Sequence, residues 1–174
     1  MKKIKFFVFL CCFITQLNHA QAFFQTTEEY LDITVKKTQF DRSKILIEDF
    51  INIDGFADDV VNNHLFTFYG IAYNDEIFSA AQMENPSCWG QFRDLCQSIN
   101  VGDSNVNNRK IIDISYLRNI HFDKDKKTVI FIYGSDLTKR NIKKHITPIL
   151  EQIQKDPSFD YIVLSLDYPM IKKH

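Results

Sequence analysis

Two short stretches near the C-terminus decide the fold: residues 128–133, TVIFIY, and residues 161–166, YIVLSL. Both are dominated by β-branched, aliphatic and aromatic residues, without the apolar–polar alternation of a strand that has one face in water. Runs of this kind are typical of strands buried on both faces, as in a parallel sheet. We therefore expect two core strands at these positions.

The segment between these strands has the pattern of a helix. In TKRNIKKHITPILEQIQK (residues 138–155), five apolar residues recur at helical spacing: Ile142, Ile146, Ile149, Leu150 and Ile153. Pro148 lies inside this pattern and predicts a kink or a late helix start. A strand, a helix and a second strand form a βαβ unit, whose strands run parallel. The sequence thus predicts an α/β fold.

The first half of the chain carries weaker signals. The aromatic run LFTFYGIAY (residues 65–73) predicts a strand. Thr26 or Thr27 is a candidate N-cap for a helix that follows it. The apolar residues of segment 43–56 match a helix and a strand about equally well, so its structure stays open. A polar turn or loop is expected at residues 102–109.

The N-terminus reads as a secretory signal. Residues 1–22, MKKIKFFVFLCCFITQLNHAQA, combine a basic start, a short apolar run and the small-x-small pattern that signal peptidase recognises. An uncleaved membrane anchor is the alternative, but the apolar run is shorter than the roughly 20 residues that span a bilayer. We predict a secreted, extracellular protein with a signal peptide at 1–22, a region of uncertain fold at 23–107 and the βαβ segment at 108–174.

The charge balance limits the classes of partner. The 174 residues include 21 basic and 22 acidic side chains, a net charge of −1. Removal of the signal takes three lysines and no acid, which leaves 18 basic and 22 acidic residues and a net charge of −4. This balance gives no reason to expect nucleic acid or an acidic membrane as a partner. Aromatic residues, at 14%, are abundant enough for a packed core.

Two cysteines remain after the predicted signal. Cys88 and Cys96 lie in NPSCWGQFRDLC with seven residues between them, and in an oxidising compartment we expect them to close one small disulfide loop. A redox or metal pair is the alternative. It is disfavoured because the spacing is not C-x-x-C and no second Cys or His pair follows at zinc-ligand spacing. We expect no metal site and no cofactor.

The C-terminal third resembles one enzyme family. Residues 126–136, KKTVIFIYGSD, are similar to the strand and turn that secreted lipases of the pancreatic lipase family end in His-Gly-aromatic. Residues 159–169, FDYIVLSLDYP, resemble that family's next core strand, which ends in Asp-Trp. Residues 114–119 and 122–123 look like the lead-in to the first of these strands. The likeness covers about 55 residues, from 113 to 167.

The resemblance implies an α/β-hydrolase core and ester hydrolysis by a Ser-His-Asp triad with the serine in G-x-S-x-G. No G-x-S-x-G occurs here, so it also implies a chain truncated before the catalytic serine, with every triad member beyond His174. The part of the site that remains is the oxyanion turn, Gly134 and Ser135, with the Ser135 amide as donor. This turn departs from the family pattern at two positions. Tyr133 stands where the family has His, and Ser135 stands where the family has a bulky aromatic residue. No catalytic residue is assigned.

Other polar groups give no second site. His145 lies beside Lys144 and close to Lys143 on the polar side of the expected helix. This position predicts that His145 is a solvated surface residue. His64 could pair with Asp58 or Asp59 across a turn. The acids of DGFADD (residues 54–59) lie near a glycine but lack the alternating ligands and closing Glu of a Ca²⁺ loop.

Three functional hypotheses remain. The first is a secreted lipase-like protein, by resemblance a hydrolase of carboxylic esters such as triacylglycerol or phospholipid, inactive as this chain alone. The second is a non-catalytic secreted protein that binds lipid or protein on a degenerate lipase core. The third is an unrelated α/β domain. A βαβ unit by itself leaves open sheet edges. We therefore expect it to self-associate or to be covered by residues 23–107.

Overall fold

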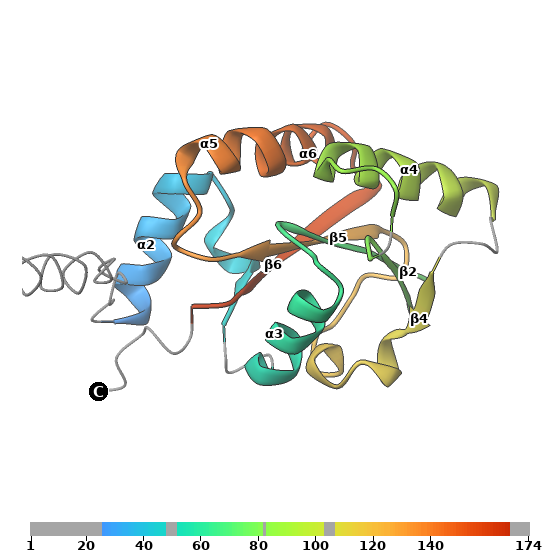
Figure 1. The fold of residues 1–174 in the computed structure, drawn as a ribbon, viewed down its shortest axis with the longest axis horizontal. Coiled ribbons are helices and arrows are strands. Elements are labelled where there is room, and N and C mark those ends of the chain that lie inside the picture. The colour runs from blue at the N-terminus through green and yellow to red at the C-terminus, as the bar shows by residue number, and fades with distance from the viewer. Residues whose placement is uncertain (1–25, 48–51, 82, 103–106, 168–174) are drawn as a thin grey trace, which may run out of the picture.

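The computed structural model describes residues 26–47, 52–81, 83–102 and 107–167. Within these ranges the chain forms one six-stranded mixed sheet of order β1-β6-β5-β2-β3-β4, with helices on both faces (Figure 1). The predicted signal peptide at residues 1–22 lies outside the described residues. None of the helices in the described part has the length and apolar character needed to span a membrane.

The two strands predicted from the C-terminal runs lie side by side. β5 (Lys127–Tyr133) and β6 (Phe159–Ser165) pair in parallel over their whole length, with Val129 opposite Tyr161. Six of the seven residues of β5 are buried, as expected for a strand covered on both faces. The prediction of adjacent parallel core strands, and with it the α/β class, is confirmed.

The connection between these strands is helical and irregular where the proline predicts it. It consists of α5 (Lys139–Asn141), a π-helical turn η5 (Ile142–Ile146) and α6 (Thr147–Ile153). Pro148 has no N–H to donate and its ring crowds the preceding turn. The chain widens there, because the Thr147 N–H bonds to a carbonyl five residues back instead of four. The apolar side of this helix packs on the sheet.

Strands from the first half of the chain cover both edges of the βαβ unit. β2 (Phe68–Tyr73) runs antiparallel to β5, and the short β1 (Ile45–Leu46) runs parallel to β6. β3 (Glu76–Ser79) and β4 (Asn108–Lys110) extend the sheet beyond β2. Within the described residues, the β5 edge of the βαβ unit is therefore paired with β2, and the β6 edge is paired with β1 at Val163 and Leu164. The strand predicted at residues 65–73 is β2.

The helices α2 and α3 of the first half each begin after a residue whose side chain caps the helix N-terminus. α2 (Thr27–Thr38) starts at Thr26, whose hydroxyl accepts from the Glu29 N–H at 3.1 Å, as predicted for one of the two threonines. The undecided segment 43–56 contains the end of a 3₁₀ turn, the strand β1 and the start of α3 (Ile53–Asn62). Its mixed periodicity thus reflects more than one element.

The predicted disulfide between Cys88 and Cys96 is wrong. Both residues lie on one helix, α4 (Cys88–Val101), and both thiols are free. Eight residues of α-helix advance about 12 Å, whereas a disulfide requires Cα atoms within about 7 Å. The spacing of the two cysteines by itself suggests a disulfide loop. The helical spacing of the apolar residues in the same segment argues against that loop.

Two hydrophobic cores lie on the two faces of the sheet, beneath the helices that cover each face. On one face, α2, α4 and α6 pack on the sheet, and the Phe40 ring lies 5.4 Å from that of Phe131 and 5.9 Å from that of Tyr161. On the other face, α3 and two 3₁₀ turns, η3 (Ile111–Asp113) and η4 (Ser115–Leu117), cover the sheet. The structure is a three-layer α/β/α arrangement.

The close approach of β2 and β3 predicts that alanine substitutions at two glycines change the free energy of unfolding by very different amounts. Gly70 sits at the bulge of β2, and a Cβ there would lie 2.2 Å from the Phe78 carbonyl oxygen. In α3, a Cβ on Gly55 would meet its nearest atom at an ordinary 3.5 Å. We expect Gly70→Ala to lower the free energy of unfolding by about 1–3 kcal/mol. We expect Gly55→Ala to be neutral or stabilising by up to about 1 kcal/mol. Urea unfolding measures both, and equal effects would contradict this packing.

Candidate functional site

The turn after β5, which the family resemblance makes an oxyanion turn, lies at the carboxyl ends of the two parallel strands. The Ser135 amide donates to Oδ2 of Asp167 at 2.8 Å, and the Ser135 hydroxyl donates to Oδ1 at 2.9 Å. Gly134 precedes it, and a Cβ there would lie 2.6 Å from Oδ1 of Asp136. This edge is where ligands bind in many open α/β sheets. Here, however, the candidate oxyanion donor is already engaged by a carboxylate of the same chain.

Asp167 is the centre of a buried polar cluster. Its side chain is 3% exposed and also accepts a 3.1 Å hydrogen bond from the Tyr30 hydroxyl, which lies 2.5 Å from the Ser165 hydroxyl. Burial raises the pKa of Asp167, and the hydrogen bonds from Ser135 and Tyr30 only partly offset it. Within the described residues no histidine hydrogen-bonds to Ser135 or Asp167, so the pair lacks the general base of a triad. The cluster fastens α2 to the ends of β5 and β6.

A second polar cluster crosses the opposite face of the sheet. The Tyr69 hydroxyl lies 2.6 Å from both Asp59 Oδ2 and the Tyr116 hydroxyl, and Tyr116 also donates to Asp59. Arg109 adds an ion pair to Asp59 at 3.1 Å and a hydrogen bond to Tyr69 at 2.8 Å. Asp59 therefore pairs with these groups and with Asn63. The pairing of His64 with Asp58 or Asp59 that the sequence allowed is not formed among the described residues.

The charges of this second cluster balance one another. Burial by itself raises the pKa of Asp59, but hydrogen bonds from Tyr116 and Tyr69, with the Arg109 charge, outweigh it and hold that pKa below its ordinary value. Burial raises the pKa of both tyrosines, which therefore remain neutral donors. Every member has a partner, so we interpret the cluster as a structural tie between α3, β2, η4 and β4.

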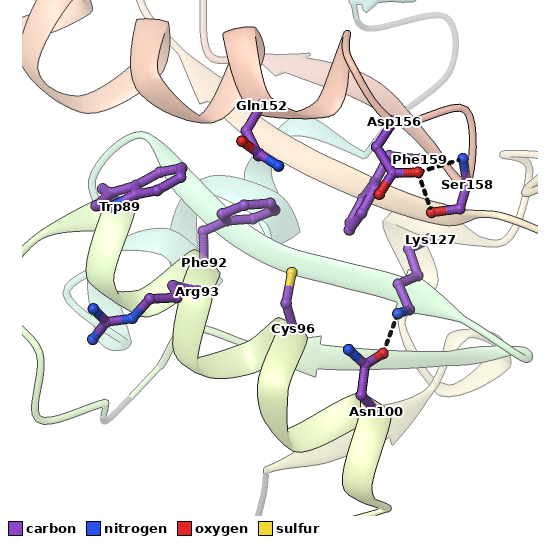
Figure 2. Close-up of a pocket in the computed structure, with 10 residues that line it drawn as sticks. All are labelled: Trp89, Phe92, Arg93, Cys96, Asn100, Lys127, Gln152, Asp156, Ser158 and Phe159. Atoms are coloured by element: carbon purple, nitrogen blue, oxygen red, sulfur yellow. Dashed lines mark hydrogen bonds between the residues drawn. The ribbon is translucent and has the colours of Figure 1, made fainter.

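A groove opens between α4, the end of α6 and the amino ends of β5 and β6, with a volume of about 380 Å³. In Figure 2 the side chains of Trp89, Phe92 and Cys96 rise from α4 toward Gln152 on α6, with Phe159 beside them. The Phe92 ring centroid lies 5.7 Å from that of Trp89 and 5.8 Å from that of Phe159. The groove thus has an aromatic floor and a solvent-exposed indole at its mouth.

The other end of the groove is polar. Lys127 donates to the Asn100 side chain (Figure 2). Its Nζ lies 5.8 Å from the Tyr73 ring centroid and 5.7 Å from that of Phe159. Asp156 accepts from the N–H and the hydroxyl of Ser158 at 3.0 and 2.7 Å, which lowers its pKa. The ammonium of Lys127 and the carboxylate of Asp156 therefore lie at this end of the groove, away from the aromatic floor.

The thiol in this groove is not a nucleophile at neutral pH. Burial raises the pKa of Cys96 to about 11, with the charge of Lys127 opposing the rise. A thiol in this state is almost entirely protonated, and the thiolate is the reactive form. Cys88 is buried at the start of the same helix and lies 3.3 Å from the Thr67 hydroxyl. Both cysteines serve packing.

Sequence reasoning missed the groove because four separated segments build it. One signal was present: Trp89, Phe92, Cys96 and Asn100 recur at helical spacing and mark one face of α4. The disulfide loop predicted for the same segment is incompatible with this helical face. Within the described ranges, no three His, Cys, Asp or Glu side chains gather closely enough to hold a metal ion. Residues 54–59 lie within α3 and do not form a loop.

Comparison with known proteins adds no relative. No family model matches this sequence. No curated protein and no solved structure matches it either. The resemblance to the pancreatic lipase family therefore rests on the quoted residues alone, and the geometry of this chain carries the functional argument.

The half-buried Asp59 and the buried Asp167 predict opposite responses to pH. Because the pKa of Asp59 is lowered, its ionisation stabilises the fold above the unfolded value near 3.9, and this contribution is lost as pH falls. Because the pKa of Asp167 is raised, its contribution is present below about 3.9 and is lost as pH rises through the folded value.

Asp59→Asn should therefore cost more stability at pH 6 than at pH 3, and Asp167→Asn should cost less at pH 6 than at pH 3. Urea unfolding of both variants and the wild type across about pH 3–6 measures the two differences. Parallel pH profiles for the two variants would show that these environments are assigned wrongly.

Proposed function

We propose that the protein binds a small amphipathic molecule of the lipid class in the groove between α4 and α6, and that it does not turn this molecule over. The observation that carries the proposal is the aromatic-floored groove of about 380 Å³ with Lys127 at its polar end. Its volume lies within the roughly 300–1,000 Å³ of small-molecule sites, which are mostly apolar with a few polar groups. An acyl chain fits such a lining.

The polar end favours a ligand with a small charged head. Lys127 is held by Asn100 and by two aromatic rings, so its ammonium is positioned without a direct ion pair to a carboxylate among the described residues. Arg93, which pairs with Asp94 at 3.0 Å, adds a second cation at the groove. Asp94 neutralises Arg93, so the ammonium of Lys127 is the cation that complements a carboxylate head group.

The absence of turnover follows from the candidate nucleophiles. Ser135 donates both its amide and its hydroxyl to Asp167, and it lies at the carboxyl ends of the strands that frame the groove at their amino ends. The Cys96 thiol, which does lie in the groove, stays protonated. Neither group is activated by a histidine among the described residues. Binding without reaction is the chemistry this arrangement supports.

One observation favours a second candidate, a carboxylic ester hydrolase core. The two stretches that resemble the pancreatic lipase family are adjacent parallel strands, and Gly134–Ser135 lies at their carboxyl ends. On that hypothesis this chain supplies the oxyanion side of a site whose triad lies outside it. Secretion, predicted from residues 1–22, is part of both proposals.

The chain's single tryptophan provides a direct test of binding. Trp89 lies at the mouth of the groove, so dodecanoate entering the groove should shift its fluorescence. We expect a saturable signal at micromolar concentrations, below the micellar range, and a loss of at least about tenfold in affinity for Cys96→Phe, whose ring would fill the floor. Val101→Phe, on the same helix but 72% exposed, is the matched control and should bind normally.

Two outcomes would contradict the proposal. One is a linear, non-saturable signal for wild type. The other is equal binding by the Cys96→Phe and Val101→Phe proteins. Turnover of a p-nitrophenyl ester well above the buffer rate, abolished by a serine-directed inhibitor, would favour the hydrolase candidate instead.

A further inference from the structure

The first two turns of the helical connection between β5 and β6 carry a dense group of cations. Lys139, Arg140, Lys143 and Lys144 follow one another at spacings of one, three and one, so Lys139 stands four residues before Lys143 and Arg140 four before Lys144. Residues four apart share a face of a helix. All four side chains are exposed. We refer to these four residues as the basic face.

Nothing in the described part of the chain neutralises the basic face. None of its four cations has a carboxylate within ion-pair distance there, whereas Lys44, Arg109 and Lys110 each have one. Asp136, the nearest acid along the chain, makes no ion pair with them. Like charges four residues apart destabilise a helix by a few tenths of a kcal/mol per pair. A protein of net charge −1 therefore concentrates unpaired positive charge on one helix.

An aromatic residue stands beside these cations. Phe66 is 46% exposed, and its ring meets the His145 ring edge-on at a centroid distance of 5.0 Å. His145 follows Lys144 directly, and burial with the charge of Lys144 lowers its pKa. The prediction of a solvated histidine is corrected here, because this histidine is half-buried and its Nδ1 is enclosed. Exposed cations beside an exposed aromatic ring are typical of surfaces that rest on lipid head groups.

We infer that the basic face with Phe66 docks this protein on the surface of an anionic lipid bilayer. The cations complement the negative head groups, and the Phe66 ring enters the interface between head groups and acyl chains. The overall charge balance, which gave no reason to expect an acidic membrane, conceals this local segregation. The inference stands independently of the groove, which lies at the other end of the same helical connection, where Gln152 lines it.

Vesicle co-sedimentation tests this inference with the purified protein at its natural amino terminus. We expect binding to vesicles of phosphatidylcholine with about one-third phosphatidylserine, and much weaker binding to phosphatidylcholine alone. Salt raised from about 0.1 M to about 0.5 M should release most of the protein. Lys143→Gln with Lys144→Gln should weaken binding about tenfold or more. Phe66→Ser should weaken it at both salt concentrations.

The chain offers a matched control for charge. Lys124→Gln with Lys126→Gln removes the same two charges at the opposite end of β5, where these lysines pair with Asp75 and Asp123. This variant should bind like wild type. Equal loss in both double variants would overturn the inference, as would no binding to anionic vesicles at low salt. Capture on heparin without binding to anionic vesicles would also overturn it, in favour of a soluble polyanion.

Discussion

The parallel pairing of β5 and β6 is the constraint on which the rest of the structure depends. The two strands match residue for residue from Lys127 opposite Phe159 to Tyr133 opposite Ser165. That register fixes what meets at each end. At the amino ends it places the Lys127 ammonium over the Phe159 ring and creates the polar end of the groove. At the carboxyl ends it places the Ser135 amide within hydrogen-bond distance of Asp167. Asp167 also accepts a hydrogen bond from the Tyr30 hydroxyl of α2.

Other elements of the same chain pack around this strand pair. β2 pairs with β5 along one edge, β1 pairs with Val163 and Leu164 of β6 on the other, and helices pack on both faces. Polar clusters then tie the covering elements in place. Asp167 holds α2 at one end, and Asp59 joins α3, β2, η4 and β4 on the opposite face through two tyrosines and an arginine.

Local signals made the central part of this fold predictable from the sequence. Apolar runs without alternation, such as TVIFIY, predict strands buried on both faces. Thr26 predicts a helix N-cap and Pro148 predicts an irregular helix. Each of these effects depends on interactions between residues only a few positions apart in the sequence. The clusters and the groove were not predictable in this way. Tyr116 reaches Asp59 across 57 positions, and Asp167 reaches Tyr30 across 137. The groove itself combines α4 with the far end of α6. The spacing of Cys88 and Cys96 predicts a disulfide loop, but the helix that carries both residues holds them too far apart.

The two functional proposals describe different surfaces of one helical connection. Its first turns present unpaired cations, and its last turn lines a cleft whose floor is aromatic. A protein that rests on an anionic bilayer and holds a single amphipathic molecule would use both. The central claim is that the groove holds such a ligand. Native mass spectrometry of the protein isolated from its natural producer, with no ligand added, tests this most directly. The account predicts an additional mass that denaturation releases as a small lipid, whereas the mass of the bare polypeptide alone would contradict it.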